Sequence, residues 1–153
     1  MNAQGLVEHL IAKGRTLSTA ESLTAGLLSA EICNVSGASR CFLGGLCAYQ
    51  DPIKANMLSV LEETLAKYSA VSAPCAREMA KGAREKFGSD YALSTTGYAG
   101  PTGEDVGLVY IGVASHRGEK AFRLRLSGSR QGIRKMTVQI ALHILQKEIK
   151  ENG

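Results

Sequence analysis

The sequence has no uninterrupted apolar run that approaches the length needed to cross a bilayer, so it predicts no membrane span. Its first residues, Met1 to Gly5, lack the basic start and the apolar core of a signal peptide. Lysine and arginine do not gather in one basic run, and the net charge of +4 is mild, so nucleic-acid binding has no support. We therefore expect a cytoplasmic protein that binds neither membrane nor nucleic acid.

The sequence also lacks any Cys-x-x-Cys pair. Its four cysteines are Cys33, Cys41, Cys47 and Cys75, and its three histidines are scattered along the chain. This spacing predicts neither a zinc site nor a disulfide framework. In a reducing compartment we expect the four thiols to pack as small apolar residues.

The composition is that of an ordinary globular protein. The chain has 153 residues, of which 44% are apolar and 21% are charged, so it is long enough to bury a core and global disorder is not expected. It contains no linker, repeat or low-complexity stretch. We expect one domain that spans residues 1–153.

Helical and strand patterns alternate along the chain. Helices are predicted from Leu6 to a stop at Gly14, directly after Ser22 for about three turns that include residues 27–32, from an N-cap at Asp51 with Pro52 at the first helical position, from Ser72 to Phe87, and from about Ser129 onward. Strands are predicted over residues 16–19, 41–49, 91–95, 107–114 and 120–126, the second of them buried and the last two forming a hairpin. This alternation indicates a layered α/β fold whose sheet is mixed.

Ser22 lies where the first predicted strand gives way to a helix. We expect its hydroxyl at the edge of the sheet, beside the free N–H groups and the positive dipole of the helix start. Such a place suits an attacking serine, a developing oxyanion or a bound phosphate. The alternative is that Ser22 or Thr24 is only an N-cap.

Lys54 is the candidate base for Ser22, because a serine hydroxyl is a poor nucleophile at neutral pH. It is placed in the first turn of a predicted helix, where the dipole disfavours a cation, and burial would lower its pKa further. The alternative is an ordinary surface lysine. A Ser-His-Asp triad has little support, since no histidine accompanies a glycine-framed serine.

A glycine-rich turn, residues 97–103, follows a predicted strand, as an anion-binding loop would. Its glycine spacing matches neither a Walker A motif nor a dinucleotide fingerprint, so an ordinary tight turn remains open. Arg130 and Arg134 are four residues apart at the start of the last helix and could hold a phosphate or a carboxylate, unless they form a solvated face. Tyr49 could order the site or belong to the core.

Four segments, in this order, resemble the CinA C-terminal domain family, the nicotinamide-nucleotide amidohydrolases. Residues 19–26 resemble the family's Thr-Ala-Glu-Ser-Cys-Thr-Gly-Gly, and residues 49–54 resemble Tyr-Ser-Asn-Glu-Ala-Lys. Residues 97–101 resemble Gly-Ile-Ala-Gly-Pro, with residues 106–110 following as expected, and residues 128–130 resemble Gly-Asp-Arg. The resemblance covers the chain from about Leu6 to Leu145.

The resemblance implies an α/β/α sandwich with a mixed sheet, often assembled as a homodimer or higher homo-oligomer. It implies hydrolysis of the amide of nicotinamide mononucleotide to nicotinic acid mononucleotide and ammonia, in pyridine-nucleotide salvage, with no metal or other cofactor. Ser22 would be the nucleophile and Lys54 its base, with Tyr49 beside them. The residues implied in substrate binding are Thr24, Gly97, Tyr98, Ala99, Gly100, Arg130 and Arg134.

The chain also departs from the family pattern. Leu23 and Ala25 replace cysteine and glycine beside the nucleophile, Asp51 replaces asparagine before the base, and Tyr98 adds bulk in the glycine-rich turn. The stretch after Gly103 is shorter than in the family and lacks its lysine. These changes leave two alternatives open: a non-catalytic nucleotide-binding member of the family, or an amidase with an altered substrate. A structural or interaction protein without a ligand is a third, weaker hypothesis.

Overall fold

The computed structural model, which describes residues 3–152, contains one five-stranded sheet in the order β2-β1-β3-β4-β5. Strands β1 (Leu17–Glu21), β2 (Phe42–Cys47) and β3 (Tyr91–Gly97) run parallel to one another. Strand β4 (Leu108–Ser115) is antiparallel to both β3 and β5 (Gly118–Arg125). The mixed sheet and the final hairpin predicted from the sequence are therefore confirmed.

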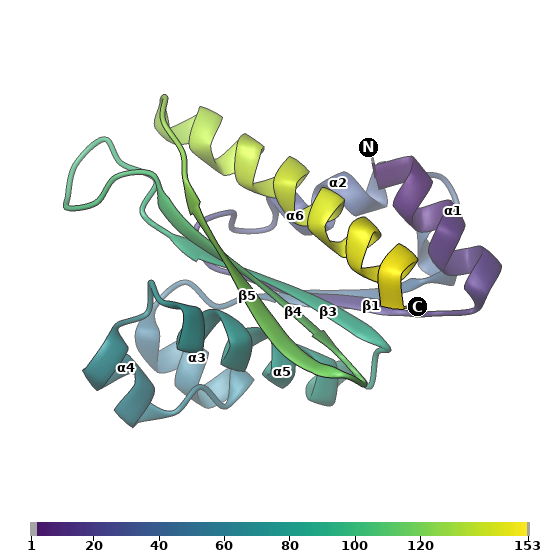
Figure 1. The fold of residues 1–153 in the computed structure, drawn as a ribbon, viewed down its shortest axis with the longest axis horizontal. Helices are drawn as coiled ribbons and strands as arrows, with labels where there is room; N and C mark the ends of the chain where they lie inside the picture. The colour runs from purple at the N-terminus through teal and green to yellow at the C-terminus, as the bar shows by residue number, and fades with distance from the viewer. Residues whose placement is uncertain (1–2, 153) are drawn as a thin grey trace.

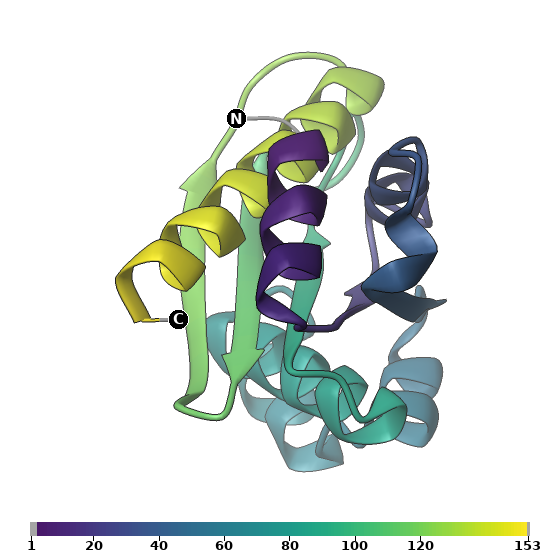
Figure 2. The same cartoon turned by 90° about the vertical axis from the view of Figure 1, so that its right-hand side faces the viewer.

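Helices cover both faces of this sheet, which gives the expected three layers (Figures 1 and 2). One face carries α1 (Ala3–Lys13), α2 (Leu27–Cys33) and α6 (Arg130–Asn152), and the other carries α3 (Asp51–Leu58), α4 (Glu62–Tyr68) and α5 (Ala73–Phe87). A short 3₁₀ turn, η1 (Ala38–Arg40), precedes β2. No helix within residues 3–152 is both long and apolar enough to span a membrane.

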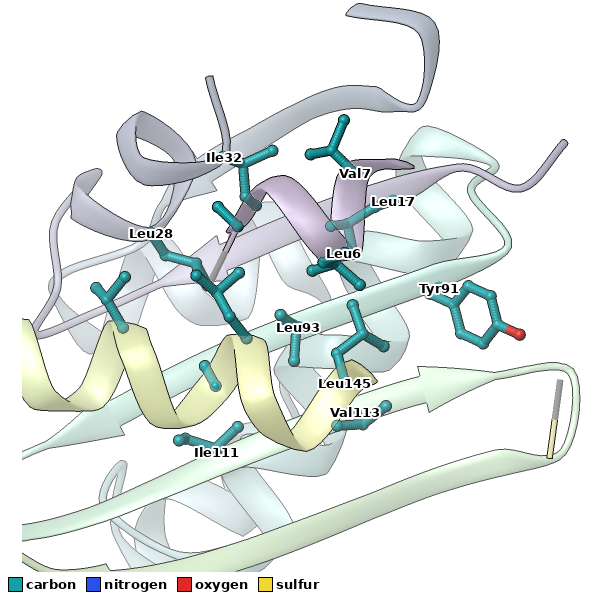
Figure 3. Packing of buried hydrophobic residues seen from close by; sticks show 14 of the residues in the cluster. Leu6, Val7, Leu17, Leu28, Ile32, Tyr91, Leu93, Ile111, Val113 and Leu145 are labelled. Carbon is teal, nitrogen blue, oxygen red and sulfur yellow. The ribbon is translucent and has the colours of Figure 1, made fainter. Parts of the chain in front are cut away.

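The larger apolar core lies between the sheet and the layer of α1, α2 and α6. Branched side chains from the strands, such as Leu93 and Ile111, meet Leu6 of α1 and Leu145 of α6 there (Figure 3). The opposite face of the sheet carries small residues, so α5 can approach it closely. A Cβ atom added at Gly112 of β4 would collide with the Ala76 carbonyl group of α5, which explains why glycine is needed at that position.

Helix α5 begins and ends as its sequence predicts. Ser72 is the N-cap, and its hydroxyl oxygen accepts a hydrogen bond from the Cys75 N–H group at 3.2 Å. Gly88 ends the helix with a positive φ of 67°. This helix anchors the layer that carries α3 and therefore fixes where Lys54 lies.

Several predictions about individual elements were wrong. The helix after Ser22 has seven residues rather than three turns, and it begins only at Leu27. Strand β2 is an edge strand with alternating exposure, not a buried one, because only β1 pairs with it; Leu43 is 47% exposed. Gln50 rather than Asp51 is the N-cap of α3, and α4 was missed altogether because its seven residues lack a strong start signal.

All four cysteines are free thiols, of which two are buried and two are exposed. Cys41 and Cys75 are buried, as expected for thiols that pack as small apolar residues. Cys33 and Cys47 are exposed, so the expectation of burial was wrong for them. Cys33 ends the short helix α2, and Cys47 ends the edge strand β2, where fewer neighbours cover a side chain.

Candidate active site

The carboxyl ends of the three parallel strands meet at one edge of the sheet and border a cavity of about 230 Å³. Ser22 follows β1, Tyr49 follows β2, and Gly97 ends β3, so the fold gathers three segments that lie far apart in the sequence. In an α/β sheet this edge is where ligands commonly bind. The cavity is lined by Ser22, Leu23, Tyr49, Asp51, Lys54, Ala70, Val71, Thr96, Gly97, Tyr98, Ala99, Gly100, Thr102 and Arg130.

Ser22 is fixed to the sheet through its backbone. Its N–H group donates to the carbonyl oxygen of Thr95 in β3 at 3.0 Å, one residue beyond the end of β1. Its hydroxyl oxygen lies 3.5 Å from the carbonyl oxygen of Tyr49. The serine therefore lies at the end of a strand, as predicted, with its side chain on the cavity.

Lys54 reaches the same point from α3. Its side chain is buried, with 1% exposure, and its Nζ donates to the Tyr49 carbonyl oxygen at 2.7 Å. Lys54 Nζ and Ser22 Oγ lie 2.7 Å and 3.5 Å from the same carbonyl oxygen, so the amine and the hydroxyl lie close to each other. The expectation of an ordinary surface lysine is therefore wrong.

Burial lowers the pKa of Lys54 below its ordinary value of 10.5, and Cys75 and Asp51 oppose this shift. Burial also raises the pKa of the Cys75 thiol to about 12, so this thiol is uncharged near neutral pH. The carboxylate of Asp51 is then the charge that counteracts the shift under those conditions. A buried lysine with a lowered pKa is a candidate general base.

The glycine-rich turn and α6 close the other side of the cavity. Arg130 Nη1 donates to the carbonyl oxygen of Gly100 at 2.6 Å, and its Nη2 donates to the Tyr49 hydroxyl at 3.1 Å. A Cβ atom added at Gly97 would lie 2.8 Å from the Leu108 carbonyl oxygen, so glycine is needed at the end of β3, where it lies close to the β4 backbone. Arg130 thus joins three segments at the rim of the cavity.

Two predicted substrate-binding residues do not line the cavity. The Thr24 hydroxyl is fully buried, within hydrogen-bond distance of Glu21 Oε1 at 2.7 Å and of the Thr95 hydroxyl at 2.8 Å. Arg134 donates from Nε to the Leu23 carbonyl oxygen at 2.8 Å and from Nη2 to the Thr24 carbonyl oxygen at 3.3 Å. Thr24 thus belongs to the segment of residues 22–26, hereafter the Ser22 turn, and Arg134 binds two carbonyl oxygens of that segment.

The N–H groups at the start of α2 are not free, contrary to the prediction. Glu21 Oε1 accepts from the N–H groups of Gly26 and Leu28, and Glu21 Oε2 accepts from the N–H and the hydroxyl of Ser29. Neither Ser22 nor Thr24 is the N-cap, which is Gly26 and has no side-chain cap. The start of α2 is therefore not available to bind a substrate anion, because the Glu21 carboxylate already binds its N–H groups.

Sequence reasoning missed the structural role of Glu21 and the place of Thr96. Glu21 could have been found from its position, since an acidic residue just before a helix that has glycine as its N-cap can supply the missing acceptor. Thr96 lines the cavity near the end of β3, and its hydroxyl donates to the Ala70 carbonyl oxygen at 2.8 Å. No group of three or more metal-ligating side chains gathers within residues 3–152.

Known proteins resemble the chain over nearly its full length. A family model described as the CinA C-terminal domain matches residues 2–149. CinA-like proteins of Dictyoglomus turgidum and Dictyoglomus thermophilum are 46% and 48% identical over 147 residues, which cover 93% of this chain and 36% of theirs. The chain thus spans about a third of the length of these relatives.

Solved structures agree with the sequence comparison. The competence damage-inducible protein A of Klebsiella pneumoniae superposes with a TM-score of 0.94 at 33% identity, covering 100% of both chains. A competence-damaged protein (CinA) superfamily protein of Escherichia coli superposes with a TM-score of 0.90 at 32% identity, over 94% of this chain and 86% of that one. These similarities agree with the mixed five-stranded sheet described above.

Proposed function

Because the chain belongs to the CinA C-terminal domain family, we propose that it is an amidohydrolase that deamidates nicotinamide mononucleotide. The products are nicotinic acid mononucleotide and ammonia, as in pyridine-nucleotide salvage. Ser22 is the nucleophile and Lys54 is its general base. The observation that carries this proposal is the convergence of Ser22 Oγ and the buried Lys54 Nζ on one carbonyl oxygen at the cavity.

The proposed reaction begins when neutral Lys54 removes the proton of the Ser22 hydroxyl as Oγ attacks the amide carbon. Protonated Lys54 then gives this proton to the leaving nitrogen, which departs as ammonia and leaves an ester on Ser22. Lys54 next deprotonates a water molecule, which cleaves the ester to release the carboxylic acid and regenerate Ser22. The lowered pKa of Lys54, caused mainly by burial, supports this role because it raises the neutral fraction of the amine.

The oxyanion of the tetrahedral intermediates needs donors that the fold has not already used. The N–H groups of Leu23 and Ala99 belong to residues that line the cavity, and neither donates to an acceptor within residues 3–152. These two groups are our candidates for the oxyanion hole, in place of the start of α2. Losing one such donor typically costs about 3 kcal/mol of transition-state stabilisation.

Arg130 is the proposed partner of the substrate phosphate. Its guanidinium group lines the cavity and is held in place by Gly100 and Tyr49. A guanidinium group matches the geometry of phosphate oxygens, and its charge is permanent. Among residues 3–152, Asp51 and the buried Lys54 are the other charged residues that line this cavity, so Arg130 is the only described cation there with an exposed position.

Product analysis in ¹⁸O-labelled water tests the proposed reaction. We expect one labelled oxygen in the carboxylate of nicotinic acid mononucleotide, together with one ammonia per turnover and no free nicotinamide. Free nicotinamide would instead reveal cleavage of the glycosidic bond and would contradict the proposal. Lys54→Ala should lose activity, and Lys86→Ala, on the exposed face of α5, is the matched control that should retain it.

A nucleotide-binding protein without turnover is the second candidate, and one observation favours it. Both Ser22 Oγ and Lys54 Nζ donate to the Tyr49 carbonyl oxygen rather than to each other. If that arrangement persists when ligand binds, Lys54 cannot take the serine proton. Tight binding of nicotinamide mononucleotide with no product in the experiment above would support this candidate and exclude the first.

A further inference from the structure

Glu21 is a buried acid that forms no salt bridge among residues 3–152. Its side chain is 1% exposed, and it accepts five hydrogen bonds, which come from Thr24 Oγ1, the N–H groups of Gly26, Leu28 and Ser29, and Ser29 Oγ, at 2.6 to 3.1 Å. Burying a carboxylate is costly unless such donors replace water. The Glu21 carboxylate therefore binds the segment that immediately follows the nucleophile, although its burial carries a free-energy cost.

The Ser22 turn has a backbone that needs support. Ala25 has a φ of 46°, which is unusual and strained for a residue with a side chain, and Gly26 has a φ of 98°. Two hydrogen bonds of the backbone, from the Ala25 N–H to Ser22 and from the Leu27 N–H to Thr24, close this turn. Glu21 binds residues on both sides of Ala25 and so holds the strained conformation.

Arg134 binds the same turn through the carbonyl oxygens of the turn rather than through its hydrogen-bond donors. It donates to the carbonyl oxygens of Leu23 and Thr24, whereas Glu21 accepts from the hydroxyl of Thr24 and from N–H groups beyond it. The anion therefore takes the donors of the segment and the cation takes its acceptors. Neither side chain lines the cavity, so neither is available to contact the substrate.

We propose that Glu21 and Arg134 are positioning residues, which lock the Ser22 turn so that the Ser22 hydroxyl and the Leu23 N–H group face the cavity together. This inference rests on the proposed function, since it concerns the geometry of the same nucleophile. A displacement of about 1 Å at a reacting group can reduce the rate about 100-fold. Losing either residue therefore lowers kcat and leaves KM nearly unchanged, because the groups that bind the substrate stay in place.

The variants are Glu21→Gln and Arg134→Met. The glutamine amide places a donor where one carboxylate oxygen stood, so at least two of the five donors lose their acceptor. Methionine keeps much of the arginine's length but donates to neither carbonyl. Arg134→Lys restores a charged donor without the planar fork, so its kcat should lie between those of the wild type and Arg134→Met.

Matched controls lie at the opposite end of the same sheet. Asp90 Oδ2 accepts from the Thr16 N–H at 2.8 Å and from the Thr16 hydroxyl at 3.1 Å, and Arg84 Nε donates to the Asp90 carbonyl oxygen at 3.0 Å. Asp90→Asn and Arg84→Met thus remove the same kinds of contact, away from the cavity. They should lower the melting temperature and leave kcat per folded molecule unchanged.

Two readouts separate this inference from the proposed function. One is kcat and KM for nicotinamide mononucleotide, and the other is the rate at which a fluorophosphonate probe labels Ser22. We expect Glu21→Gln and Arg134→Met each to reduce kcat and the labelling rate about 100-fold, with KM changed by less than about threefold. If the wild type is labelled but releases no ammonia, the proposed substrate is wrong, and the labelling rates still test the positioning role.

Three results would overturn the inference. The first is a labelling rate in both Glu21→Gln and Arg134→Met within about threefold of the wild-type rate. The second is an equal loss of labelling in the Asp90→Asn and Arg84→Met controls, which would show that reduced stability alone explains the effect. A wild-type Ser22 that the probe does not label at all would overturn the positioning role and the serine mechanism together.

Discussion

Replacing Lys54 by methionine should make the protein more stable at neutral pH while abolishing its activity. The lysine side chain is buried, and its Nζ makes one hydrogen bond, to the Tyr49 carbonyl oxygen. Methionine occupies a similar volume and carries no charge to bury. It forfeits that hydrogen bond, worth about 1 kcal/mol, but removes the larger cost of a buried ammonium group. Substitutions that sacrifice function in this way commonly add about 1 kcal/mol of stability.

The size of this gain should depend on pH in a defined direction. Burial holds the pKa of Lys54 in the folded protein below the 10.5 that it has in the unfolded chain. Between these two values the unfolded state binds more protons, so the wild-type free energy of unfolding rises with pH by at most about 1.4 kcal/mol per pH unit. Below the lowered pKa both states are protonated, and the wild type carries the full cost of the buried cation.

Urea unfolding of the wild type and Lys54→Met across pH 6 to about 10.5 measures this difference. We expect Lys54→Met to be the more stable protein at pH 6, with its advantage shrinking as pH rises toward 10.5. Lys86→Met, which replaces an exposed lysine on α5, is the control for removing a positive charge. A difference that is constant with pH, or that grows as pH rises, would refute the burial of a titrating Lys54.

The same titration must appear in the kinetics. If neutral Lys54 is the base, kcat/KM rises with pH through the lowered pKa of the free enzyme. That pKa should equal the pH at which the stability difference between wild type and Lys54→Met begins to change. Two unrelated measurements thus report one group, and a clear disagreement between them would exclude Lys54 as the base.

Three further outcomes follow from the structure. Asp51→Asn should move the rise of kcat/KM to lower pH, since the Asp51 carboxylate raises the pKa of Lys54; a pH–rate profile checks this. Arg130→Ala should raise KM more than it lowers kcat, because a phosphate contact is largely uniform binding; an unchanged KM would remove Arg130 from the site. Gly82→Ala should destabilise by about 2 kcal/mol, because its Cβ would collide with the α3 backbone, whereas Gly132→Ala should change stability by less than about 1 kcal/mol, because its Cβ would meet only the Ser129 side chain, at 3.1 Å; thermal unfolding compares them.

The parts of the fold that followed from the sequence are those with a strong local cause. Ser72 and Gly88 bound α5 because capping and left-handed conformations are determined by single residues. The hairpin of β4 and β5 likewise has a local turn between two β-rich runs. The exposure of β2 could not be predicted in this way, because it depends on which strands pair beside it.

The candidate site shows the same division. Ser22, Tyr49, Lys54 and the glycine-rich turn could be gathered in advance, because the carboxyl ends of parallel strands share one edge of a sheet. The binding of Glu21 to the N–H groups at the start of α2 could not be predicted from the sequence. A free helix start and one bound by Glu21 differ only in the conformation of the Glu21 side chain. Thr24 and Arg134, which were predicted to bind substrate, instead form hydrogen bonds within and to the Ser22 turn.

The most direct test of the account is ammonia release from nicotinamide mononucleotide by the purified protein, measured beside Ser22→Ala. The account predicts steady release by the wild type, with nicotinic acid mononucleotide as the other product, and no release by the variant at an unchanged melting temperature. Substantial release by Ser22→Ala would contradict the serine mechanism. No release by a folded wild-type protein that still binds the nucleotide would contradict the proposed reaction itself.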